Sequence, residues 1–109
     1  MHELSITQGI VDTISERMGD ARITGVRLEI GRLSGVLPEQ VRFCFDLVCA
    51  GTALDGAWLE IIEPRGTALC HRCGAEFEPP SLLALCQCGS ADVQIRSGQE
   101  LRITALEVA

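Results

Sequence analysis

The 109-residue sequence has no tyrosine, one tryptophan and three phenylalanines, so aliphatic side chains must form most of its core. Positive charge is also scarce, because 9 basic side chains stand against 15 acidic ones and the formal charge is −6. Proteins that grip nucleic-acid phosphates need a basic surface, and this balance argues against that class. The apolar content of 47% is enough for one compact domain with a small appendage.

The sequence also lacks long apolar runs. No stretch approaches the roughly 20 apolar residues that span a bilayer. The opening residues Met1-His2-Glu3-Leu4 have neither the basic start nor the apolar centre of a secretory signal. We therefore expect a cytoplasmic protein with no membrane insertion. In that reducing compartment, six cysteines are more often metal ligands or buried thiols than disulfides.

The first periodic segment, Leu4–Met18, predicts an amphipathic helix, since isoleucine or methionine recurs at every fourth position. Ser5 and Gln8 have the spacing of a capping box at its start. Gly19 is placed to end the helix.

A second helix is predicted to begin at Pro38, which suits a first helical turn, and to close at Gly51. Its apolar stripe consists of Val41, Cys44, Phe45 and Val48. Cys44 is therefore expected to be a buried thiol that packs as a small hydrophobe, whereas Cys49 is given no role.

Three segments have the pattern of β-strands: Ile23–Gly31, Ala57–Glu63 and Glu100–Val108. In the first, Val26, Leu28 and Ile30 share a face, and in the last, Leu101, Ile103 and Ala105 do. The predicted fold is of the α/β (α+β) class: a small mixed three-stranded sheet with two helices, plus an inserted zinc-ribbon-like hairpin domain. We expect residues 1–67 and 98–109 to form the first domain and residues 68–97 the insertion.

The predicted insertion contains a paired cysteine motif. Cys70 and Cys73 are two residues apart, and a short spacer separates them from Cys86 and Cys88. Two close pairs joined by a hairpin-sized spacer are typical of a tetrahedral zinc site. A glycine follows each pair, and glycine permits the positive φ that a zinc-binding turn often needs.

Two alternatives to zinc remain open for these cysteines. Reduced thiols or a disulfide would leave a short segment with little core of its own. A redox-active Cys70-His-Arg-Cys73 would need a following helix to lower its thiol pKa, and the sequence after Cys73 has a strand and turn pattern. The single-residue spacer of Cys86-Gln-Cys88 is short, so His71 can be considered as a substitute ligand.

The first two residues form a second candidate metal site. The α-amine of Met1, the backbone nitrogen of His2 and its imidazole can chelate one cation through fused small rings. Nitrogen donors in that arrangement favour Ni(II) or Cu(II), which accept square-planar geometry. The alternative is a solvated chain end without a ligand.

Four segments together resemble the HypA/HybF family of hydrogenase nickel incorporation proteins, and the resemblance spans essentially the full length. They are the opening Met1–Ser5, the strand and loop Val26–Ser34, the helical Phe43–Val48, and Cys88-Gly-Ser90 followed by Gly98–Ile103 and Glu107. Their order and spacing agree with the family as well as their residues.

The resemblance implies a nickel metallochaperone for [NiFe]-hydrogenase, not an enzyme. Nickel, the cargo, would use the amine of Met1, the imidazole and amide of His2 and the backbone amide of Glu3, whose side chain tunes the site. Structural zinc would use Cys70, Cys73, Cys86 and Cys88. The implied partners are a HypB-type GTPase and the hydrogenase large-subunit precursor, and a homodimer is compatible with the resemblance.

The chain departs from the family at Cys86-Gln-Cys88, where a two-residue spacer is usual. The alternative function is a zinc-ribbon adaptor that binds protein or nucleic acid without a nickel role. A thiol oxidoreductase is a third possibility. No set of residues in the sequence has the pattern of a catalytic site.

Overall fold

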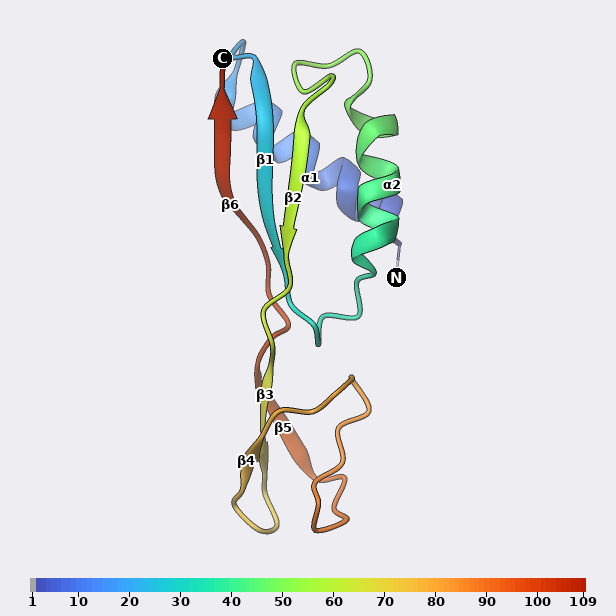
Figure 1. Ribbon diagram of the computed structural model, residues 1–109, viewed down its shortest axis with the longest axis vertical. Helices are drawn as coiled ribbons and strands as arrows, with labels where there is room; N and C mark the ends of the chain where they lie inside the picture. Colours follow the sequence, from blue (N-terminus) through green and yellow to red (C-terminus); the bar gives the residue numbers. More distant parts are fainter. Residues whose placement is uncertain (1) are drawn as a thin grey trace.

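The computed structural model describes residues 2–109, which form an elongated molecule with extents of 53 × 20 × 18 Å. A sheet with two helices occupies one end, and a smaller sheet with long loops occupies the other (Figure 1). The elements in chain order are α1 (Glu3–Met18), β1 (Ile23–Ile30), α2 (Pro38–Cys49), β2 (Trp58–Ile62), β3 (Thr67–Cys70), β4 (Glu76–Phe77), β5 (Val93–Ser97) and β6 (Leu101–Val108).

The larger sheet has the strand order β2-β1-β6. β1 pairs with β2 in parallel and with β6 antiparallel, so the predicted mixed sheet is confirmed. The parallel pair needs a crossover connection, and α2 supplies it. In Figure 1, α1 crosses behind this sheet and α2 runs beside β2.

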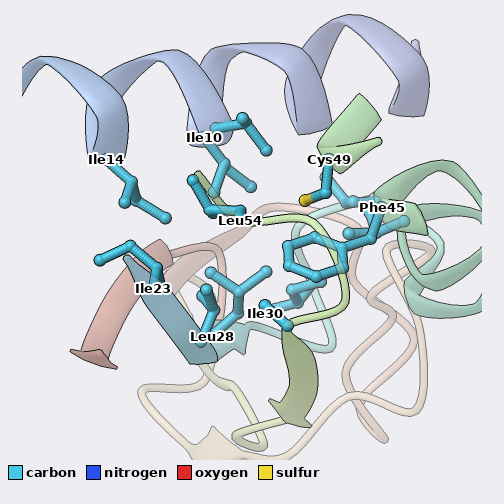
Figure 2. Close-up of a cluster of buried hydrophobic side chains, with 13 residues drawn as sticks. Ile10, Ile14, Ile23, Leu28, Ile30, Phe45, Cys49 and Leu54 are labelled. Atoms are coloured by element: carbon cyan, nitrogen blue, oxygen red, sulfur yellow. The ribbon is translucent and has the colours of Figure 1, made fainter. Parts of the chain in front are cut away.

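The core of this part lies between the two helices and one face of β1. Val26, Leu28 and Ile30 are fully buried there, as their alternation predicts. Figure 2 shows how isoleucines from α1 and β1 converge with side chains of α2 and of the loop before β2. The labelled members are Ile10, Ile14, Ile23, Leu28, Ile30, Phe45, Cys49 and Leu54. The core is almost entirely aliphatic, with Phe45 as its one buried aromatic ring among the described residues.

The start of α1 differs from the prediction. The helix begins at Glu3 and its N-cap residue, His2, makes no side-chain capping hydrogen bond. Ser5 therefore lies inside the first turn, and Gln8 donates to the Asp12 carboxylate at 2.9 Å instead of forming a capping box. The predicted helix end is confirmed, because Gly19 is the C-cap residue.

The two cysteines of α2 also differ from the prediction. Cys49 is buried, whereas Cys44 is half-buried at the side of the helix. Val41, Phe45 and Cys49 are each four residues apart, so they share the face that enters the core. Burial raises the pKa of the Cys49 thiol to about 11, with Asp46 and Asp55 adding to the effect, so Cys49 is an inert apolar side chain.

A bulge in β6 changes its predicted alternation. Arg27 lies opposite Ala105 and Leu28 lies opposite Ile103, which leaves Thr104 as an extra residue. The side chains of β6 change phase at this point. Leu106, not Ala105, joins Ile103 against the core.

The smaller sheet has the order β4-β3-β5 and is antiparallel throughout. The chain segments that connect the two sheets cross at a narrow neck, where Gly31, Gly66 and Gly98 lie. A Cβ on Gly98 would lie 2.4 Å from the Gly66 Cα, and one on Gly31 would lie 2.0 Å from the Gly98 oxygen. The Leu33 N–H donates to the Gly98 carbonyl at 2.8 Å, and the Leu33 side chain is buried in this neck.

Among residues 2–109, no helix has the length and apolar character needed to cross a membrane.

Replacing Phe45 with alanine should lower the free energy of unfolding by about 3–5 kcal/mol, because it removes the aromatic ring from the core around the larger sheet. Phe43 on the same helix is 61% exposed and provides the matched control, with an expected change of no more than about 0.5 kcal/mol. Urea unfolding followed by circular dichroism measures both. Equal losses in the two variants would contradict this assignment of the core.

Candidate metal centre

Four cysteines from two turns of the smaller sheet meet at one point. Cys70 ends β3 and Cys73 lies in the turn before β4, while Cys86 and Cys88 come from the loop before β5. All four sulfur atoms lie within 4.8 Å of one another. Two contacts join the two pairs: 3.7 Å between the sulfurs of Cys70 and Cys88, and 3.5 Å between those of Cys73 and Cys86.

These separations fit a four-coordinate metal ion. A tetrahedral zinc ion with Zn–S bonds of about 2.3 Å holds its sulfurs about 3.8 Å apart. The single residue between Cys86 and Cys88 does not prevent this arrangement, because both sulfurs reach the cluster. The donor set of four sulfurs suits a thiophilic metal such as zinc.

Backbone hydrogen bonds shape both cysteine turns. Gly74 donates to the Cys70 carbonyl with φ of 78°, and Gly89 donates to the Cys86 carbonyl with φ of 90°. These left-handed glycines agree with the prediction for a zinc-binding turn. The Cys86 N–H also donates to the Ser90 carbonyl at 3.1 Å, which closes the shorter turn.

Hydrogen bonds in the first cysteine turn favour the thiolate form of Cys70. The Cys73 N–H donates to the Cys70 sulfur at 3.5 Å. Together with the Arg72 N–H and the neighbouring thiols, this contact lowers the pKa of Cys70 to about 6. Cys70 is therefore ionised at neutral pH, in the form that binds metal. Cys70 and Cys86 are buried while Cys73 and Cys88 are exposed, so one side of the cluster faces solvent.

His71 is not part of the sulfur cluster. Its Nδ1 lies 3.3 Å from Asp92 and its Nε2 lies 3.2 Å from Gln94. The Gln94 and Asp92 contacts raise the pKa of the imidazole. Both ring nitrogens thus contact side chains of β5 or of the loop before it. His71 therefore does not act as the substitute ligand considered above.

The redox alternative has no support in the local structure. A reactive Cys-X-X-Cys pair is activated at the N-terminus of a helix. Here Cys70 ends a strand, and Cys73 leads through a glycine turn into the short strand β4.

The predicted nickel ligands are at the start of α1, beside the start of α2 (Figure 1), and of these Met1 lies outside the described residues. His2 is exposed and caps α1, and its carbonyl accepts the first described helical hydrogen bond, from Ile6 at 3.0 Å. The backbone nitrogens of His2 and Glu3 precede that bond. Helix geometry gives them no carbonyl four residues earlier, so they have no intrahelical acceptor.

The Glu3 side chain has a contact that the sequence did not indicate. Its carboxylate accepts a hydrogen bond from the Leu37 N–H at 3.2 Å, and Leu37 is the N-cap residue of α2. This bond lowers the pKa of Glu3. The carboxylate thus ties the first turn of α1 to the start of α2, while the Glu3 backbone nitrogen remains at the helix end beside His2.

Comparisons with known proteins cover the whole chain. The family model described as "Hydrogenase/urease nickel incorporation, metallochaperone, hypA" matches residues 1–108. A hydrogenase maturation factor HypA from Trichormus variabilis is 45% identical over 108 residues, or 99% of this chain and 96% of that protein. One from Crocosphaera subtropica is 46% identical over 109 residues, with the same coverage.

The fold agrees with a solved structure of the same kind. The solution structure of the Ni metallochaperone HypA from Helicobacter pylori superposes with a TM-score of 0.67 at 25% identity, covering 99% of this chain and 97% of that one. These descriptions name a metallochaperone or a maturation factor and no enzyme, in agreement with the expectation of a non-catalytic protein. The match from residue 1 to residue 108, with relatives of nearly equal length, shows that this chain belongs to the HypA family of nickel-incorporation metallochaperones.

Proposed function

We propose that this protein is a cytoplasmic nickel metallochaperone that binds Ni(II) at its N-terminus and delivers it to the precursor of a [NiFe]-hydrogenase large subunit. The observation that carries this proposal is the family match over the full chain, which includes the Met1-His2-Glu3 opening. The relatives described as hydrogenase maturation factors support the same role. A HypB-type GTPase is the proposed partner in the delivery.

The proposed nickel ligands are the amine of Met1, the amide and imidazole of His2, and the amide of Glu3. Consecutive nitrogens of this kind form fused chelate rings and suit square-planar Ni(II). The exposure of His2 and the absence of helical acceptors for these amides support the assignment. The Glu3 carboxylate contributes indirectly, because its bond to Leu37 holds the first helical turn in place.

The proposed resident metal is Zn(II), held by Cys70, Cys73, Cys86 and Cys88. Its role is structural: a four-sulfur site has no open position for a substrate. We further propose that residues 68–97 form a zinc domain inserted into the nickel-binding domain of residues 1–67 and 98–109. The two sites thus use chemically different ligands, sulfur for the ion that stays and nitrogen for the ion that is transferred.

Replacing His2 with alanine should remove tight Ni(II) binding and lower the affinity at least about 100-fold, because the imidazole closes a chelate ring. The sequence has only one other histidine, His71, whose replacement with alanine is the matched control and should leave nickel affinity unchanged. Isothermal titration of zinc-loaded protein with an unmodified N-terminus measures both. Wild-type affinity in the His2→Ala variant would place the nickel site elsewhere, and a zinc-only wild-type protein would favour the adaptor alternative.

Nickel affinity should fall steadily as the pH is lowered from about 8 to 6. Nitrogen ligands bind a metal only in their deprotonated form, so protons compete with the metal for the same lone pairs. The measurement is a competition titration with a chelator at several pH values, with zinc content checked at each. Equal affinity at pH 6 and pH 8 would contradict nitrogen ligation at the N-terminus.

Replacing Cys73 with alanine should reduce bound zinc from one ion per chain to well below one and should increase hydrogen exchange in residues 68–97. Three sulfurs form an incomplete site, and the small sheet has little else to hold it. Cys44→Ala, which changes a cysteine outside the cluster, is the control and should retain one zinc. Elemental analysis gives the zinc content, and full zinc occupancy in Cys73→Ala would exclude this residue as a ligand.

A further inference from the structure

Strand β6 forms an open edge of the larger sheet. It pairs with β1 on one side, and within residues 2–109 no strand pairs with its other side. Its eight residues equal β1 in length. Two of its apolar side chains remain partly uncovered, because Leu101 is 37% exposed and Val108 is 45% exposed. A long edge strand with apolar residues is a template for pairing with another chain.

Backbone contacts at the two ends of β6 show which of its groups face β1. The Gly31 N–H donates to the Glu100 carbonyl at 2.9 Å, and the Ala109 N–H donates to the Arg22 carbonyl at 3.0 Å. Backbone groups alternate in direction along an antiparallel strand. Starting from Glu100, which faces β1, the backbone groups of Leu101 and Ile103 face the free edge. Counting back from Ala109, which also faces β1, the backbone groups of Val108 and Leu106 face the free edge.

The bulge at Thr104 makes these two halves of the edge compatible. In a regular strand, Ile103 and Leu106 would point in opposite directions because they are three positions apart, an odd number. The extra residue resets the alternation. All four outward residues therefore present their backbone groups to the same edge and their side chains to the same face. Bulges often protect an edge from pairing, but this one brings both halves of the edge into phase.

We propose that this edge pairs antiparallel with β6 of a second copy of the chain, around a two-fold axis between Thr104 and Ala105. In this register, Leu101 lies opposite Val108 of the other copy and Ile103 lies opposite Leu106. The backbone groups of these residues face each other, so each pair exchanges two hydrogen bonds. All four outward residues find a partner, and the two sheets become one continuous sheet of six strands.

The charges on the outer face match in the same register. Arg102 lies opposite Glu107 of the other copy, and symmetry repeats the pair. Both side chains are already held on this face, Arg102 by Glu29 at 2.7 Å and Glu107 by Thr24 at 2.8 Å. Opposite charges directly across a pair of strands stabilise the pairing. The sequence of β6 thus complements itself in backbone, apolar and charged groups.

The helical face leaves room for the second copy. A groove of about 410 Å³ runs between α1 and β6, and Ser5, Gly9 and Thr13 line its helical side. A Cβ on Gly9 would meet no atom within 4 Å. In the paired arrangement the two grooves face each other across the axis, so the two α1 helices can approach through small side chains.

The test exchanges the charges in two separate variants of the zinc-loaded, untagged chain. Arg102→Glu places only acidic pairs across the axis, and Glu107→Arg places only basic pairs there. Each variant alone should have a dimer dissociation constant raised about tenfold or more, because every dimer contains the repulsive pair twice. An equimolar mixture restores both opposite-charge pairs and should form a heterodimer of wild-type stability. Sedimentation equilibrium measures all three samples and the wild type.

Arg27→Glu is the matched control. It reverses a charge on the same outer face and breaks the 2.8 Å bond to Glu60, but it lies on β1, away from the edge. This variant should dimerise like the wild type. A monomeric wild type at millimolar concentration, or a dimer unaffected by either charge variant, would overturn the proposal.

Hydrogen exchange provides a readout that is independent of side-chain charge. The amides of Leu101, Ile103, Leu106 and Val108 should become slower to exchange as the protein concentration rises. The amides of Arg102 and Glu107 face β1 and should be protected at every concentration. Dimerisation without slowing of the four outward amides would place the interface elsewhere and overturn the proposal.

Discussion

The smaller sheet depends on the convergence of four sulfur atoms. Its buried hydrophobic side chains are Ala68, Cys70 and Cys86, and two of these three are cysteines. Strands of two to five residues with so little apolar burial cannot offset the conformational entropy lost on folding. Backbone hydrogen bonds lower the pKa of Cys70, so the turn favours the charged thiolate, and a divalent cation bound there would neutralise that charge. Binding of the proposed metal would therefore be coupled to the folding of this segment.

The part of the molecule that contains the larger sheet and both helices is stabilised by the burial of apolar side chains. Two helices and one face of β1 enclose a continuous aliphatic core. Such a core gives a rigid platform at whose edge the first turn of α1 lies. Glu3 fixes that turn to α2 through the Leu37 N–H, and His2 stays exposed beside it. This arrangement suits the proposed transfer of nickel, since a carrier needs ligands that are accessible and yet held in a defined place.

The neck explains how two such different parts keep one shape. Three glycines allow chain segments to cross at distances that a Cβ would prevent. Backbone hydrogen bonds between these segments, together with the buried Leu33, tie the smaller sheet to the end of β1 and to the start of β6. The insertion is thus joined through three segments, although only two chain connections lead into it.

The sequence by itself determined the elements that have strong local signals. Hydrophobic periodicity placed both helices and the three strands of the larger sheet, and cysteine spacing identified the four sulfurs that the structure brings together. Tertiary structure decided what depends on contacts between distant residues. Cys49 and not Cys44 is buried in the core because of how α2 packs. The bulge at Thr104 follows from the register between β6 and β1. The three glycines at the neck are required because chain segments cross there too closely for a Cβ. Periodicity reports which face of an element is apolar, but which residue on that face is buried depends on the neighbour that packs against it.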